Sequence, residues 1–229
     1  MRSRWWAECL GTFILVFAGT GAIVVNHASG GMVTNLGVAL TFGLVVMAMI
    51  YAFGEVSGAH LNPAVTLAFC LARRFPARSL FAYISAQIAG AFAASLLLRI
   101  LFPDAPSLGA TLPAGPPMQS FVLEVVLTFI LMLVILAVSS GPSERGIMAG
   151  IAVGGVVGLE ALFAGPICGA SMNPARSLAP AIVSGQTQHL WIYLCAPVLG
   201  AALAVPAAAL VRTHHPRPKL ARKPAPRRQ

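Results

Sequence analysis

The residues of this chain whose type and spacing suggest chemistry are two copies of Asn-Pro-Ala: Asn62, Pro63 and Ala64, and then Asn173, Pro174 and Ala175. Asn is a favoured N-cap and Pro is favoured at the first helical position, so each copy predicts the start of a helix. When the Asn side-chain oxygen caps the first turn, its NH₂ group remains a free hydrogen-bond donor. Inside a membrane such a donor must find a partner or line water.

Two such helix starts that enter a membrane from opposite sides would place Asn62 and Asn173 head to head. Each helix N-terminus carries roughly +0.5 charge, so the meeting point repels cations. A water molecule there accepts hydrogen bonds from both Asn residues and donates to neither, which fixes its orientation and interrupts a chain of proton-conducting waters. One Asn-Pro would indicate only a helix start, whereas two matched copies favour a pore for neutral molecules.

Arg176 follows the second Asn-Pro-Ala directly. An unpaired Arg within a membrane span costs at least ~2.5–3.5 kcal/mol on insertion scales, so we expect it to face water. At a constriction its guanidinium would reject cations and donate to the oxygens of a solute. No group of residues with the spacing of a catalytic site is present, and we expect no enzyme activity.

Two carboxylates, Glu8 and Glu124, interrupt apolar segments, where acids are expensive and usually functional. They would serve either as a proton relay or as acceptors for backbone N–H groups of the loops that precede Asn-Pro-Ala. Their matched placement favours the second role, because both loops need the same acceptor. The roles of Glu55, Glu160 and Cys168 stay open at this stage.

The composition excludes a soluble globular protein. Of 229 residues, 58% are hydrophobic and only 9% are charged, against roughly 25% charged in an average soluble domain; the mean hydropathy is +0.83. Six apolar stretches are long enough to span a membrane: 5–26, 35–54, 80–102, 119–139, 147–164 and 190–212. Two further pieces, 62–71 and 173–183, cover only half the hydrocarbon thickness, since ten helical residues rise about 15 Å.

The two halves of the chain repeat one another. The pattern E-x-x-x-T-F-I-L begins at Glu8 and again at Glu124, and G-A-x-x-N-P-A begins at Gly58 and again at Gly169. Each half holds three spans and one half-length helix, so the second half enters the membrane from the opposite side. We therefore predict an all-α membrane protein with six transmembrane helices and two re-entrant half-helices. Its channel domain spans 1–212, with inverted repeats at about 1–102 and 119–212.

The charge distribution predicts orientation. The chain has 15 Lys and Arg against 6 Asp and Glu, a formal net charge of +9. Most basic residues fall at the chain ends and in short loops that share one side of the membrane: Arg2, Arg4, Arg73, Arg74, Arg78, Arg145 and the tail from 212. The positive-inside rule then places both termini in the cytoplasm, with the protein in the plasma (inner) membrane. This bias accounts for the basic balance, so we expect no nucleic-acid partner, and we expect 213–229 to be a disordered basic tail.

Cysteine and histidine spacing predicts neither a metal nor another cofactor. The four Cys residues lie apart in apolar stretches without a C-x-x-C pair, and none of His27, His60 and His189 has a Cys, Asp or Glu at metal-ligand spacing. The lipid bilayer, water and small neutral solutes are the partners that the sequence indicates.

The paired Asn-Pro-Ala motifs and the E-x-x-x-T-F repeat resemble the aquaporin and glycerol-facilitator family, also called the major intrinsic proteins, up to about residue 212. The resemblance implies an aquaporin-like fold and a homotetramer with one pore in each subunit. It also implies a selective constriction formed by Phe42, Ala161, Ala170 and Arg176.

Three positions distinguish subgroups within that family. Strict water channels typically carry His where this chain has Ala161, and glycerol facilitators carry Trp and Asp where it has Phe42 and Ser177. The run from Ala164 to Leu178 is most similar to the nodulin-like intrinsic proteins of plants. That resemblance implies a channel for water, glycerol and metalloid hydroxides such as boric, arsenous or silicic acid. A water-selective aquaporin is the alternative, and a proton-coupled transporter that uses Glu8, Glu124 or Glu160 is the runner-up from another class.

Overall fold

The structure is a computed structural model that describes residues 2–139 and 148–211. The predicted tail at 213–229 lies outside the described residues. All the regular elements of the described chain are helices, in the order α1 (Arg2–Ala28), α2 (Thr34–Ser57), α3 (Pro63–Leu71), a short 3₁₀ turn η1 (Ala77–Ser79), α4 (Leu80–Leu101), α5 (Pro117–Val138), α7 (Ala149–Cys168), α8 (Pro174–Ser184) and α9 (Leu190–Val211).

Six of these helices, α1, α2, α4, α5, α7 and α9, are long and apolar enough to cross a membrane. The helices α3 and α8 have nine and eleven residues, as expected for half-length elements. Both start at Pro, directly after an extended Asn, because Asn caps the first turn and Pro has no N–H to leave unpaired. The predicted fold class is confirmed.

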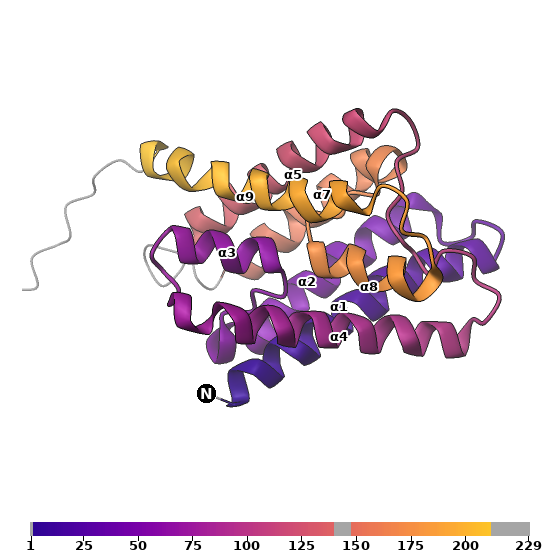
Figure 1. Cartoon of the computed structure of the whole chain (residues 1–229), viewed down its shortest axis with the longest axis horizontal. Coiled ribbons are helices and arrows are strands. Elements are labelled where there is room, and N and C mark those ends of the chain that lie inside the picture. The colour runs from indigo at the N-terminus through magenta and orange to yellow at the C-terminus, as the bar shows by residue number, and fades with distance from the viewer. Residues whose placement is uncertain (1, 140–147, 212–229) are drawn as a thin grey trace, which may run out of the picture.

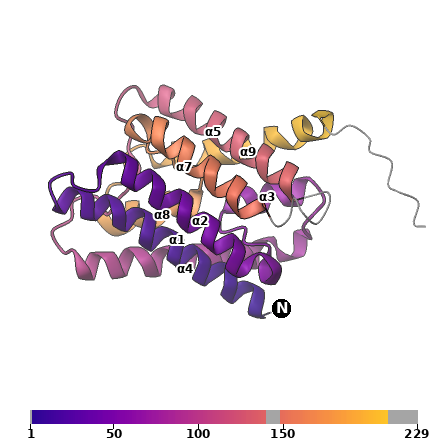
Figure 2. The same cartoon turned by 180° about the vertical axis from the view of Figure 1, so that it is seen from behind.

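The two half-helices lie inside the bundle of long helices. Figure 1 shows α3 and α8 between α4 and α9, and both half-helices pack against these two helices. The opposite view shows α1, α2 and α7 covering the other side (Figure 2). The packing repeats as well: α1 packs on α4 as α5 packs on α9, and α2 packs on α7 across the two halves.

Glycine permits the closest of these helix contacts. A Cβ atom on Gly90 of α4 would overlap the carbonyl oxygen of Cys9 on α1, and a Cβ on Gly200 of α9 would overlap the carbonyl oxygen of Val125 on α5. Small residues at helix interfaces let backbones approach in this way within membranes. The repeat therefore extends from the sequence to the backbone contacts.

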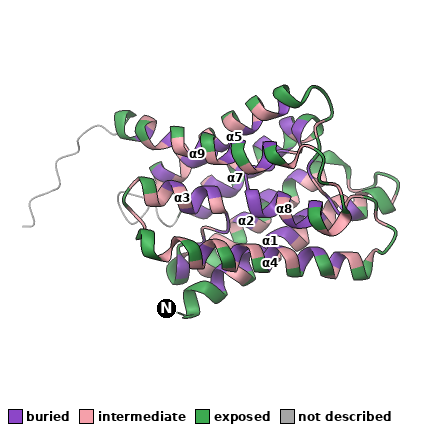
Figure 3. Ribbon diagram, viewed as in Figure 1, coloured by how far each residue is buried: buried purple, intermediate pink, exposed green. Residues whose placement is uncertain are grey.

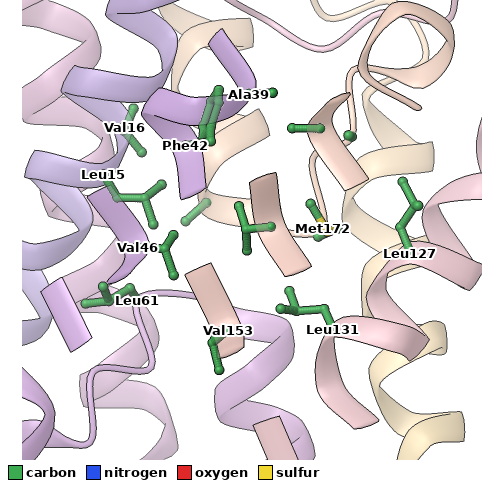
Figure 4. Close-up of a cluster of buried hydrophobic side chains, with 14 of the residues drawn as sticks. Leu15, Val16, Ala39, Phe42, Val46, Leu61, Leu127, Leu131, Val153 and Met172 are labelled. Atoms are coloured by element: carbon green, nitrogen blue, oxygen red, sulfur yellow. The ribbon is translucent and has the colours of Figure 1, made fainter. Parts of the chain in front are cut away.

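Burial follows the pattern of a membrane bundle. Buried residues line the inner faces of the helices, while large apolar side chains such as Trp6, Phe81 and Leu210 are exposed on the outside (Figure 3). The central cluster gathers side chains from α1, α2, α5 and α7 and from the loop before α8, among them Leu15, Val46 and Met172 (Figure 4). An apolar exterior of this extent suits lipid rather than water.

Candidate functional site

The two Asn residues cap their half-helices as the sequence predicts. The side-chain oxygen of Asn62 accepts a hydrogen bond from the backbone N–H of Ala64 at 2.9 Å. The oxygen of Asn173 accepts from the N–H groups of Ala175 at 3.0 Å and Arg176 at 3.3 Å. Both amide oxygens are therefore occupied by the protein.

The NH₂ groups of the same residues tie the two halves together reciprocally. Asn62 Nδ2 donates to the carbonyl of Met172 at 2.7 Å, and Asn173 Nδ2 donates to the carbonyl of Leu61 at 2.9 Å. Each NH₂ group carries two hydrogens, so one hydrogen of each remains after this bond. Sequence reasoning predicted the free donors, but it did not find that each Asn first binds the loop of the other half.

The loops before α3 and α8 share an unusual backbone. Ala59 and Leu61 have φ angles of 46° and 53°, and their counterparts Ala170 and Met172 have 40° and 53°. Residues with a side chain rarely adopt this left-handed region, and such strain is found at functional sites. The same two positions of the loop are therefore strained in both halves.

Buried carboxylates hold both loops. Glu8 accepts from the backbone N–H groups of His60 at 2.9 Å and Leu61 at 2.7 Å. Glu124 accepts from those of Ser171 at 2.7 Å and Met172 at 2.8 Å. Both acids are completely buried.

Glu8 has two further donors that sequence reasoning missed. Ser57 Oγ donates to it at 2.7 Å, and Gln87 Nε2 at 2.8 Å. Gln87 also donates to Thr66 Oγ1 at 2.9 Å. An amide side chain within the apolar run of α4 was the signal that could have identified this partner, because a buried amide needs hydrogen-bond partners.

The half-helix starts open onto an internal cavity of about 120 Å³. Its polar wall comes from the two loops, with Asn62, Asn173 and Arg176, and its apolar wall comes from α1, α2, α5 and α7. Phe42, Val46, Val153 and Leu131 lie around it (Figure 4). Among the described residues, no hydrogen bond ends on the carbonyls of Ala59, His60, Ala170 or Ser171, which belong to residues of this wall.

Of the four residues expected at the constriction, three line this cavity: Phe42, Ala170 and Arg176. The guanidinium carbon of Arg176 lies 5.0 Å from the centroid of the Phe42 ring, within the range of a cation–π contact. Ala161 is buried in the central cluster but does not border the cavity.

The loop between α4 and α5 folds against Arg176. Arg176 Nη1 donates to the carbonyl of Gly109 at 2.8 Å, and Thr111 Oγ1 donates to Ser177 Oγ at 2.8 Å. Ser177 and Ser171 share a further hydrogen bond of 2.5 Å. The sequence left the conformation of this loop open, since its prolines and glycines carry no helix or strand pattern.

Two residues whose roles the sequence left open are buried and do not border the cavity. Glu160 is 1% exposed, and neither of its carboxylate oxygens has a hydrogen-bond partner. Cys168 is buried, with Sγ 3.5 Å from the carbonyl of Ala164. Glu55 is exposed at the end of α2. Within the described ranges, no group of His, Cys, Asp and Glu side chains could hold a metal ion.

Comparison with known proteins agrees with this arrangement. The family model of the major intrinsic proteins matches residues 2–207. The chain is 54% identical over 208 residues to aquaporin NIP1-4 of Oryza sativa subsp. japonica, covering 90% of this chain and 76% of that protein. It is 46% identical over 196 residues to nodulin-26 of Glycine max, covering 85% of this chain and 72% of that protein.

A solved structure is also similar. The X-ray structure of the aquaglyceroporin from Plasmodium falciparum matches with a TM-score of 0.78 at 28% identity, covering 91% of this chain and 99% of that one.

Proposed function

Because the chain belongs to the major intrinsic protein family, we propose that it is a passive channel for water and small uncharged solutes that excludes protons and other ions. The solutes are glycerol or metalloid hydroxides such as boric, arsenous or silicic acid. The observation that carries the proposal is the Asn62 and Asn173 pair, which binds the opposite loops and keeps one amide hydrogen each beside a cavity.

The wall of the cavity suits neutral hydrogen-bonding molecules. A molecule in the cavity accepts from the remaining amide hydrogens and from Arg176, and donates to the unoccupied carbonyls of Ala59, His60, Ala170 and Ser171. The opposite wall is apolar and offers no competing partner, so the polar strip sets the orientation of the molecule. A water accepts from both Asn residues and cannot pass a proton onward through them.

Cations meet two obstacles. The N-termini of α3 and α8 present partial positive charge at the Asn pair. Arg176 adds a full charge beside Phe42. Neither obstacle acts on an uncharged solute.

Polyhydroxy solutes match the constriction that we propose, formed by Phe42, Ala161, Ala170 and Arg176. Two of its four side chains are single methyl groups, which leave space for a solute wider than water. Arg176 supplies donors for solute oxygens, and Phe42 supplies an apolar face for carbon-bound hydrogens. A water-selective aquaporin is the second candidate, favoured by the contact of Phe42 with Arg176, which narrows this end of the cavity.

The bonding of the buried acids argues against a proton-coupled transporter. Glu8 accepts four hydrogen bonds, two from its loop and two from side chains. A relay acid must exchange protons with both sides of the membrane in turn. An acid that holds a loop with this many donors is poorly suited to that task.

We propose that the channel assembles as a homotetramer in the plasma (inner) membrane, with both termini cytoplasmic. Basic residues at the start of α1 and in the turn after α3 lie at ends of helices that the positive-inside rule assigns to the cytoplasm: Arg2, Arg4, Arg73, Arg74 and Arg78. The exposed apolar faces of the long helices supply surface for lipid and for neighbouring subunits.

Stopped-flow light scattering on proteoliposomes with the purified protein tests the proposal. The vesicles are challenged separately with an impermeant osmolyte, glycerol and boric acid, using the wild type, Ala161→His and the control Leu159→His. Leu159 precedes Ala161 by two residues on α7 but is 59% exposed, so an imidazole introduced there would face lipid. We expect rapid solute entry in the wild type. Ala161→His should lose solute entry but retain water flow, and Leu159→His should behave as the wild type.

Water flow without solute entry in the wild type would instead identify the water-selective candidate. Solute entry that saturates and follows a proton gradient would identify a transporter and contradict the proposal.

A further inference from the structure

The inverted repeat allows the supports of the two loops to be compared position by position. In the first half, Gln87 and Ser57 donate to Glu8, and Tyr83 Oη donates to the carbonyl of Ser57 at 2.8 Å. The counterpart of Glu8 in the second half is Glu124. The donor hydrogens of Gln87, Ser57 and Tyr83 therefore all have partners, although Gln87 Oε1 has none.

The second half lacks two of those donors. The helices α4 and α9 align at L-x-x-Y-x-x-A-x-x-x-G, which places Tyr193 at the position of Tyr83 and Pro197 at the position of Gln87. Proline has neither a backbone N–H nor a side-chain donor. The residue before the Gly-Ala pair is Ser57 in the first half and Cys168 in the second, and a thiol is a weak donor. Glu124 keeps only its two backbone donors at full strength.

Two buried polar groups near the second support have no partner with full hydrogen-bond geometry. Tyr193 is 0% exposed, and its hydroxyl interacts with the Ser120 side chain but has no partner with full hydrogen-bond geometry, unlike that of Tyr83. Both carboxylate oxygens of Glu160 are likewise unpaired at 1% exposure. Glu160 and Tyr193 each interact electrostatically with Glu124, and their helices α7 and α9 both pack against α5, which carries Glu124.

Leaving such groups dry would be costly. A buried polar group without a partner costs about 1–3 kcal/mol, and more when it is charged. Native proteins usually satisfy such groups with buried water, which takes about three hydrogen bonds. Glu124, Glu160 and Tyr193 together offer enough acceptors, and a donor, for that number.

Glu160 also lies close to the cavity along α7. Glu160 lies three residues after Val157 on α7, about 4.5 Å further along the helix axis. Val153 and Val157 border the cavity, and Glu160 follows them on the same buried stripe of α7. A water that leaves the cavity wall has about one helical turn to cover.

We propose that the second half holds a buried water site formed by Glu124, Glu160 and Tyr193, whose water takes the place that the Gln87 amide holds in the first half. The water donates to Glu124 as Gln87 donates to Glu8, and Glu160 keeps it there. Glu160 is thus a positioning residue: through the water and Glu124 it holds the N–H groups of Ser171 and Met172, and so the loop that leads into Arg176.

The first test is direct observation. An experimental structure of the full-length protein in lipid, at a resolution that reveals waters, is expected to show one within hydrogen-bond distance of Glu160 and Glu124. Well-ordered side chains of Glu160 and Glu124 with no water between them would overturn the proposal. This observation does not depend on which solute the channel conducts.

The second test uses variants and the exchange of the backbone amides of residues 169–173, measured by hydrogen–deuterium exchange mass spectrometry. Glu160→Leu removes the polar group, and exchange is expected to accelerate about tenfold. Glu160→Gln retains an acceptor and adds an amide donor, so exchange should stay near the wild-type rate. Glu55→Gln, at an exposed carboxylate, is the matched control for charge.

Rescue separates hydrogen bonding from packing. Pro197→Gln places an amide at the position of Gln87, so adding it to Glu160→Leu should restore slow exchange. Wild-type exchange in Glu160→Leu, or no rescue by Pro197→Gln, would contradict the proposal. Should Glu160→Leu fail to fold, accelerated exchange in Glu160→Gln would contradict it equally, because that variant keeps the bonding capacity of the site.

Discussion

The side-chain amide of Asn35 donates to the carbonyl oxygen of Leu162 at 2.8 Å. Leu162 lies four residues before Pro166, which sits inside α7 and has no N–H to complete the helical bond to that carbonyl. Asn35, from the first turn of α2, supplies the missing donor. The bond joins the two halves of the repeat, since α2 belongs to the first half and α7 to the second.

Asn35→Ala should therefore destabilise the protein by about 1 kcal/mol, because the Leu162 carbonyl loses its donor. Thermal unfolding of the purified protein in detergent would measure the change. The control is the same substitution in a Pro166→Ala background, where the restored N–H serves the carbonyl and the loss should become small. An equal loss in both backgrounds would mean that Asn35 acts by another contact.

Gly200→Ala is expected to destabilise the protein strongly. Its Cβ would overlap the carbonyl oxygen of Val125, so α5 and α9 would have to separate. Inserting one methyl group into a close-packed contact costs about 1–3 kcal/mol. Gly155→Ala on α7 is the control, because nothing lies within 4 Å of its added Cβ; it should be neutral or stabilise the helix by about 0.5–1 kcal/mol. Equal melting temperatures for the two variants would contradict the packing argument.

The helices of this fold could be predicted from the sequence because lipid imposes strong constraints on a chain. Each span must be apolar over about 20 residues and hydrogen-bonded internally, so hydropathy alone identifies it. The half-helices were predictable from Asn62 and Asn173, since capping chemistry acts between neighbours in sequence. The predicted end of the fifth span at 164 was too early: α7 continues to Cys168. Proline favours a helix end, but α7 continues through Pro166. The donor that the Leu162 carbonyl needs comes from Asn35 on another helix, which the local sequence does not reveal.

The site could be predicted only in part, because some of its bonds join residues that are far apart in the sequence. The two Asn residues and the acids stand in repeated motifs, and Arg176 directly follows one of them, so the sequence identifies these residues. The reciprocal bonds of Asn62 to Met172 and of Asn173 to Leu61 depend on how the halves meet, as does the bond of Arg176 to Gly109. Gln87 carried a local signal, an amide in an apolar run, but its partner Glu8 lies on another helix.

Glu8→Gln should lower the free energy of unfolding by about 2–3 kcal/mol. The substitution keeps the shape but replaces one oxygen with an NH₂ group, which faces the N–H of either His60 or Leu61 and leaves it without an acceptor. Glu55→Gln removes the same charge at an exposed position and should change stability little. Thermal unfolding of both variants checks the difference; similar losses would mean that net charge, rather than loop support, matters.

The charge of Arg176 should act as the barrier to protons and cations at the Phe42 end of the cavity. Arg176→Val removes the charge and leaves the carbonyl of Gly109 without its donor, which should cost about 1–3 kcal/mol, a loss that folding should survive. Proton entry into proteoliposomes that contain a pH-sensitive dye should then rise by at least about tenfold, corresponding to a barrier lowered by about 1.4 kcal/mol.

The matched control for that experiment is Arg99→Val. Arg99 also donates to backbone carbonyls of the loop between α4 and α5, those of Pro103 and Ala105, but it does not border the cavity. Arg99→Val removes a positive charge near the same loop but leaves Arg176 at the constriction. Proton entry should therefore stay at the wild-type level. If both variants leak equally, the loop rather than the charge of Arg176 forms the barrier. If neither leaks, the Asn62 and Asn173 pair alone is sufficient, because its oriented amides and the two helix N-termini still oppose a proton at the centre of the pore.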